Sequence, residues 1–92
     1  MRILIVEDEK KVAAFIKKGL EEETYAVDIA ADGEEGLYMG GQNQYDLIIL
    51  DLMLPKINGL DILSSLRAKK NDVPILLLTA KDSVEDKVKG LN

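Results

Sequence analysis

Three short apolar runs constrain the fold of this chain more than any other feature, because each is followed by side chains that carry oxygen. The runs are residues 3–6, 47–50 and 75–78, and the residues that follow them are Glu7 with Asp8, Asp51, and Thr79. Continuous Val, Ile and Leu runs of this length are typical of strands buried on both faces of a parallel sheet. Open α/β sheets bind ligands at the carboxyl ends of such strands. We therefore expect these side chains, far apart in sequence, to meet at one site.

The composition is that of one ordinary globular domain. The 92 residues are 47% hydrophobic and 32% charged, unlike a disordered chain. The net charge of −5, with lysine pairs placed among acids, argues against a nucleic-acid-binding surface. The chain has no cysteine, no histidine, no signal-peptide core and no apolar stretch near about 18 residues. We expect a cytoplasmic protein that contacts neither nucleic acid nor a membrane through this domain.

Strand patterns recur along the whole chain. Apolar runs or alternation predict strands over residues 2–6, 25–30, 46–50 and 73–78. The second strand alternates polar and apolar residues, which places it at a sheet edge. Four strand–helix units with right-handed crossovers predict an α/β fold with a flavodoxin-like, doubly wound parallel sheet of strand order 2-1-3-4. The first and third strands are neighbours in this order, so Glu7, Asp8 and Asp51 should lie side by side.

Helical periodicity fills the intervals between the strands. A first helix should end near Glu22, a second should cover residues 33–40 and stop at Gly40-Gly41, a third should follow Gly59, and a fourth should begin at Ser83. The predicted inward-facing residues are Val12, Ala13, Phe15, Ile16 and Leu20 in the first helix and Leu60, Leu63 and Leu66 in the third.

The predicted group of acids suggests a particular chemistry. Two carboxylates 4 Å apart repel each other by about 4 kcal/mol at an effective dielectric near 20, so a compensating cation is needed. Mg²⁺ prefers such oxygen ligands and commonly accompanies phosphate. A carboxylate beside the metal can attack phosphorus and form an aspartyl phosphate, and Thr79 could donate a hydrogen bond to a phosphoryl oxygen. Each residue alone also has a structural explanation, since Glu7 and Asp8 could favour a helix N-terminus and Asp51 could cap a turn.

The chain resembles the receiver domains of two-component response regulators, most closely those of the OmpR and PhoB type. The matching segments are residues 3–9, residues 51–55 with Gly59 and residues 66–67, and residues 74–82. The resemblance implies that Asp51 is the phosphoacceptor for a sensor histidine kinase. It also implies that Glu7, Asp8, Asp51 and the backbone carbonyl of Met53 bind Mg²⁺, and that Thr79 is the switch hydroxyl.

The same resemblance sets expectations for the whole domain. Receiver domains of this family usually have a CheY-like fold of five strands and five helices, so residues 1–92 should be the N-terminal portion of one, with the fourth helix incomplete and the fifth strand, its lysine and the fifth helix absent. Switching, which normally controls an output such as transcription, should then be impaired, and Mg²⁺ binding should be easier to retain. An exposed fourth strand or fourth helix should promote homo-oligomers. We expect no enzyme activity beyond self-phosphorylation and self-dephosphorylation.

Other functions agree less well with these residues. The main alternative is an interaction or scaffold module without phosphorylation, in which the acids serve the structure alone, or a domain-swapped fragment. A phosphatase with an aspartate nucleophile would need a D-x-D motif after the first strand, where this chain has Glu7, Asp8 and Glu9. A nucleotide-binding or flavin protein would need a glycine-rich phosphate loop there, and none is present.

Overall fold

A computed structural model describes residues 1–42 and 44–78. The elements are β1 (Arg2–Val6), α1 (Lys10–Glu22), β2 (Ala26–Ala30), α2 (Gly33–Gln42), β3 (Leu47–Asp51), α3 (Gly59–Ala68) and β4 (Ile75–Leu78). The helix predicted from Ser83 lies outside the described residues, as does Thr79.

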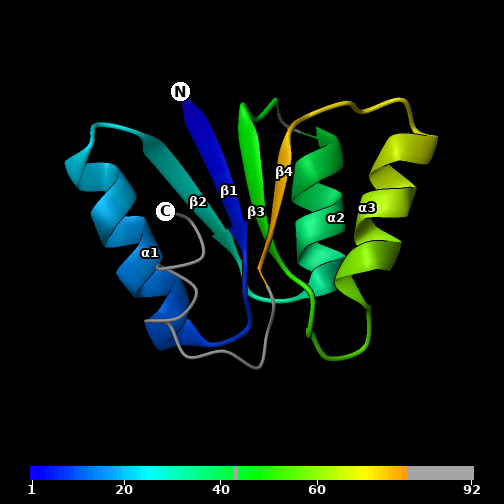
Figure 1. The fold of residues 1–92 in the computed structure, drawn as a ribbon, viewed down its shortest axis with the longest axis horizontal. Coiled ribbons are helices and arrows are strands. Elements are labelled where there is room, and N and C mark those ends of the chain that lie inside the picture. The colour runs from blue at the N-terminus through cyan, green and yellow to red at the C-terminus, as the bar shows by residue number, and fades with distance from the viewer. Residues whose placement is uncertain (43, 79–92) are drawn as a thin grey trace.

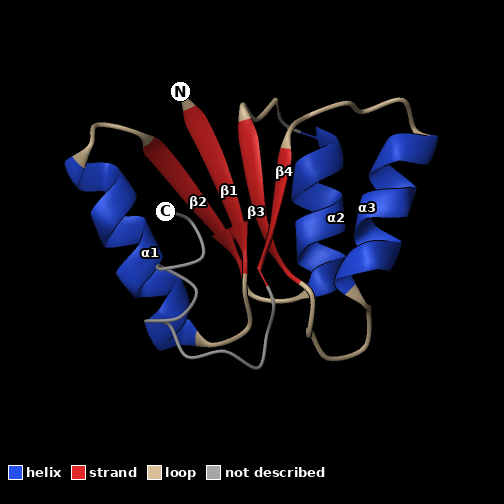
Figure 2. Ribbon diagram, in the orientation of Figure 1, coloured by secondary structure: helices blue, strands red, loops and turns tan. Residues whose placement is uncertain are grey.

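The strands form one parallel sheet in the order β2-β1-β3-β4, which confirms the predicted order. Helix α1 covers one face of the sheet, and α2 and α3 cover the other (Figure 1). All four strands run the same way, so their carboxyl ends share one edge with the loops that lead into the helices (Figure 2). β4 is the outer strand of the described sheet, and the expected homo-oligomer through it stays a prediction.

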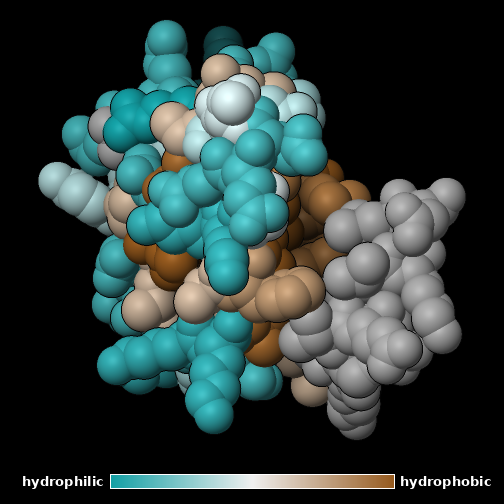
Figure 3. Space-filling view, turned by 90° about the vertical axis from the view of Figure 1, so that its left-hand side faces the viewer, coloured by the Kyte–Doolittle hydropathy of each residue, from teal (hydrophilic) through white to brown (hydrophobic). Residues whose placement is uncertain are grey.

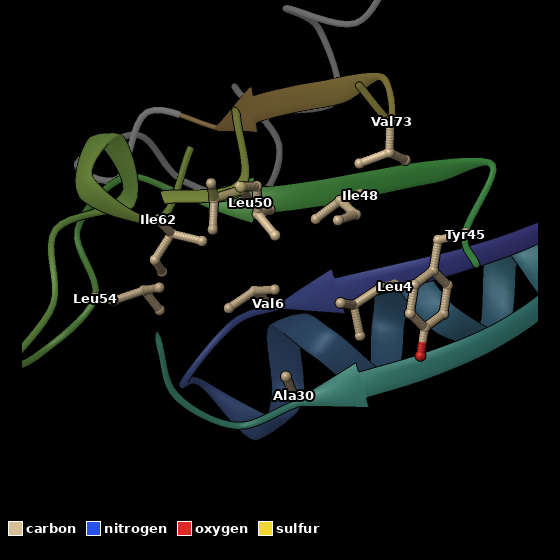
Figure 4. Packing of buried hydrophobic residues seen from close by; sticks show 10 residues of the cluster. Leu4, Val6, Ala30, Tyr45, Ile48, Leu50, Leu54, Ile62 and Val73 are labelled. Atoms are coloured by element: carbon tan, nitrogen blue, oxygen red, sulfur yellow. The ribbon is translucent and has the colours of Figure 1, made fainter. Parts of the chain in front are cut away.

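The strand residues alternate between two hydrophobic clusters, one on each face of the sheet. Leu4 and Val6 belong to the cluster under α2 and α3, together with Ile62 (Figure 4). Ile3 and Ile5 belong to the cluster under α1. Both clusters need apolar side chains from the same strand, which explains why β1 is a continuous apolar run. Viewed from the α1 side, hydrophilic side chains cover much of the surface, and hydrophobic residues are visible between them (Figure 3).

Several predicted element boundaries were wrong. β3 is Leu47–Asp51 and not residues 46–50, and β4 begins at Ile75 and not at residue 73. For two further boundaries the structure shows the reason. β2 begins at Ala26 and not at Tyr25, because the Tyr25 amide donates to the Leu20 carbonyl at 3.2 Å and thereby closes α1. Helix α2 continues through the glycine pair to Gln42. Gly40 is buried there, and a Cβ at this position would lie 3.4 Å from the Ile48 side chain. Gly40 is therefore packed inside the helix against the sheet and does not end the helix.

Two predicted inward-facing residues also point to solvent. Phe15 in α1 is 59% exposed and Leu60 in α3 is 52% exposed. In α3 the buried residues include Ile62, which is 1% exposed, and Leu66. Leu60 is two positions from Ile62, about 200° around a helix, and therefore lies on the opposite side.

No helix in residues 1–42 and 44–78 has the length and apolar character needed to cross a membrane.

Candidate metal centre

Strand pairing brings the predicted acids together at the carboxyl edge of the sheet. Val6 pairs with Leu50, so the next residues along the two neighbouring strands are Glu7 and Asp51. Asp8 follows directly. One carboxylate oxygen from each of the three acids lies within 4.8 Å of the others. The expected proximity of the three acids is therefore present in the structure.

The three carboxylates differ in their access to solvent. Glu7 is 2% exposed and Asp51 is 4% exposed, whereas Asp8 is exposed. Burial of carboxylates removes hydration that would otherwise stabilise their charge, so close packing of two such groups needs compensation. The site is therefore buried at Glu7 and Asp51 and open to solvent at Asp8.

The alternative role of Glu7 and Asp8 as helix caps is not what the structure shows. The N-cap of α1 is Glu9, it makes no side-chain cap hydrogen bond, and the first turn holds no acidic residue. Glu7 accepts a long hydrogen bond of 3.4 Å from the Glu9 amide to its Oε1. This bond is at the outer limit for an amide donor, and it is not a helix-capping bond.

The turn-capping alternative for Asp51 is partly present. Its Oδ1 accepts a hydrogen bond from the Met53 amide at 3.0 Å. This bond fixes the rotation of the carboxyl group and uses one of its two oxygens, while both can accept more bonds. Asp51 thus stabilises its own turn and also belongs to the acid group.

Gly59 holds the loop after β3 against the strand end. Its amide donates to the Leu52 carbonyl at 3.3 Å. A Cβ on Gly59 would lie 2.7 Å from the Asp51 carbonyl oxygen and 2.8 Å from the Leu52 Cα, and both atoms belong to the backbone. Only glycine fits this approach. The sequence suggested a loop-breaking role for Gly59, but its contact with the backbone of Asp51 could not be inferred from spacing.

A shallow hollow of about 550 Å³ opens beside the acids. Its lining residues are Asp8, Leu52, Met53, Leu54, Pro55, Lys56 and Asn58. Met53 is 55% exposed and belongs to this lining, while the role of its carbonyl as a ligand stays a prediction. Lys56 was not among the site residues predicted from the sequence. A basic residue directly after Pro55, in the loop that follows a candidate nucleophile, was the available signal.

Thr79 lies outside the described residues, so its role also stays a prediction. The preceding residue, Leu78, pairs with Asp51 in the sheet register.

The donor set at this edge suits a hard divalent cation. It offers three carboxylates within 4.8 Å, one of them exposed, and Mg²⁺ prefers oxygen ligands of this kind with some coordination positions left to water or phosphate. The residues present therefore fit a magnesium ion.

The chain matches the family described as the response regulator receiver domain over residues 3–92. It belongs to this family. Among curated relatives, this receiver domain is 53% identical over 90 residues to the transcriptional regulatory protein PcoR of Escherichia coli, covering 98% of this chain and 40% of that protein. The domain thus spans about 40% of the length of that relative.

Solved structures of receiver proteins share the fold. The response regulator protein TrrA of Thermotoga maritima, in complex with Mg²⁺ and BeF, matches this receiver domain with a TM-score of 0.82 and 36% identity, over 99% of this chain and 98% of that one. A complex of the histidine kinase ThkA with TrrA matches with a TM-score of 0.80 and 44% identity, over 89% and 71% of the two chains. Both similarities agree with the four-stranded order of this receiver domain.

Proposed function

We propose that Asp51 accepts a phosphoryl group from the phosphohistidine of a sensor histidine kinase, and that the modified domain controls an output such as transcription. The observation that carries this proposal is the position of Asp51, buried at a strand end with Glu7 and Asp8 within 4.8 Å. The relatives support it: PcoR is a transcriptional regulatory protein, and TrrA forms a complex with a histidine kinase and another with Mg²⁺ and BeF.

The transfer requires little covalent chemistry from the domain. An oxygen of Asp51 attacks phosphorus, the new O–P bond forms as the P–N bond to the donor imidazole breaks, and the imidazole takes a proton from solvent. The hydrogen bond from the Met53 amide to Asp51 Oδ1 at 3.0 Å orients the carboxylate for this attack. Glu7, Asp8, Asp51 and the Met53 carbonyl would hold Mg²⁺, which offsets the negative charge that the phosphoryl group brings to the acids. The domain acts as an acceptor with at most self-phosphorylation and self-dephosphorylation, and not as an enzyme toward other molecules.

The test is phosphorylation of the expressed protein by a small acyl phosphate with and without Mg²⁺. We expect a base-labile phosphoryl adduct that requires Mg²⁺ and is absent from Asp51→Asn, as measured by intact mass. The matched control is Asp46→Asn, an exposed aspartate just before the other end of β3, which should retain the adduct. A wild-type protein that remains unmodified, or an adduct that persists in Asp51→Asn, would contradict the proposal and favour a scaffold module.

A further inference from the structure

Among the residues that the structure describes, Lys56 is the only basic one that lines the hollow beside the acids, and it shares that lining with Asp8. The side chain is exposed, and among residues 1–42 and 44–78 it has no ion-pair partner within 4.0 Å. The ammonium group is therefore available to an incoming molecule.

The backbone at Lys56 is unusual. Its φ is 70°, in the left-handed region that L residues other than Asn and Asp seldom adopt. Bonds on the following side hold this turn: the Ile57 amide donates to the Pro55 carbonyl at 2.8 Å, and the Leu60 amide donates to the Asn58 side chain at 2.7 Å. Thr24 and Lys70 have similar φ values of 71° and 62° outside the site, so the conformation alone assigns no role. The position of Lys56 at the rim of the hollow suggests one.

The charges around the site indicate what the role of Lys56 is. Three carboxylates within 4.8 Å of one another repel any anionic donor that approaches, and a bound divalent cation offsets only part of their charge. A hollow of about 550 Å³ is roughly 8 Å across, which is comparable to the Debye length of about 10 Å at 0.1 M salt. The charge of Lys56 is therefore felt throughout the hollow at low salt.

We propose that Lys56 attracts anionic phosphoryl donors into the hollow and so determines how strongly the site prefers donors of higher negative charge. This inference rests on the proposed function of Asp51 and adds a selectivity residue to it. Lys56 does not take part in the transfer itself; it acts on the encounter between donor and site.

The test compares two small donors of different charge, acetyl phosphate as a dianion and phosphoramidate as a monoanion, in the whole expressed protein. Lys56→Gln should lower kcat/KM for acetyl phosphate by about two- to fourfold at low ionic strength, with a smaller loss for phosphoramidate. Both losses should shrink toward none as the salt concentration rises to about 0.5 M. Lys56→Arg keeps the charge and should behave like wild type.

The matched control is Lys69→Gln, which removes the same charge from an exposed residue at the C-cap of α3, the end of that helix away from Asn58. This variant should leave both rates unchanged. Three results for Lys56→Gln would overturn the inference: equal losses for the two donors, losses that do not depend on salt, or an unchanged rate. The proposed function would still be supported in these cases, provided that the wild-type protein is phosphorylated. A wild-type protein that neither donor modifies would overturn both.

Discussion

At the amino-terminal end of the sheet, Asp28 is matched by donors from two neighbouring segments: Arg2 Nη2 lies 3.0 Å and Tyr45 Oη lies 2.8 Å from its Oδ2. The Arg2 guanidinium also lies 5.2 Å from the centre of the Tyr45 ring. Figure 4 shows the Tyr45 side chain beside Leu4, with its hydroxyl directed toward β2. At the carboxyl end, Glu7, Asp8 and Asp51 meet one another, and neither aspartate forms an ion pair with any residue that the structure describes.

The two ends show how identical residue types come to have different roles. An acid on a strand whose neighbours supply an arginine and a tyrosine ties adjacent strands together, and its charge is already compensated. An acid at a strand end whose neighbours are other acids carries excess negative charge, which an external cation can offset. The first arrangement stabilises the fold, and the second suits the proposed metal site.

The largest expected effect concerns the backbone that shapes the carboxyl end. Gly59→Ala should lower the free energy of unfolding by about 3 kcal/mol, because its Cβ would meet backbone atoms of Asp51 and Leu52 that cannot move cheaply. Urea unfolding measures the change. Gly41→Ala is the control, since no described residue lies within 4 Å of a Cβ there and alanine favours the helix, so stability should rise slightly. Equal stability of the two variants would show that the strand end is not tightly packed.

A smaller effect of opposite sign should follow from removing one charge of the acid group. Without Mg²⁺, Asp51→Asn should raise the free energy of unfolding by about 1 to 2 kcal/mol, because it relieves repulsion at a buried position while the amide oxygen can still accept from the Met53 amide. Thermal unfolding in a chelating buffer measures the change. A loss of stability would mean that the acids at this end are already compensated.

The smallest effect belongs to the amino-terminal end. Asp28→Ala should lower the free energy of unfolding by about 1 kcal/mol, since it removes the Tyr45 hydrogen bond together with an ion pair whose side chains are 48% and 36% exposed. Part of the loss should disappear at high salt, because the ion-pair contribution is screened. A gain in stability would show that Arg2 and Tyr45 do not compensate Asp28, and the two ends of the sheet would then not differ in this respect.

The sequence predicted the parts of this structure that depend on uninterrupted apolar runs. The strand order and the approach of Glu7 to Asp51 follow from run length and from the chirality of crossovers, and both are present. The faces of the helices were harder to predict. Leu60, Leu63 and Leu66 are spaced like an apolar stripe, yet the packing of α3 buries Ile62 together with Leu66 and leaves Leu60 exposed.

Features that depend on contacts between segments far apart in the sequence, or on the detailed conformation of a turn, could not be predicted. The interaction of Arg2 with Asp28 and Tyr45 joins residues 26 or more positions apart, and no local pattern marks it. The left-handed backbone at Lys56 is likewise set by the turn between β3 and α3 and not by a glycine in the sequence. The first feature depends on the register of the sheet, and the second depends on the conformation of that turn.

The central claim, that the acids at the carboxyl end form a divalent cation site, is tested most directly by calorimetric titration of the expressed protein with Mg²⁺. Wild type should bind one ion per chain, Asp8→Asn should bind it at least about tenfold more weakly because a charged ligand is lost, and Asp28→Asn should bind it as wild type does. Undiminished affinity in Asp8→Asn, or an equal loss in Asp28→Asn, would contradict the claim.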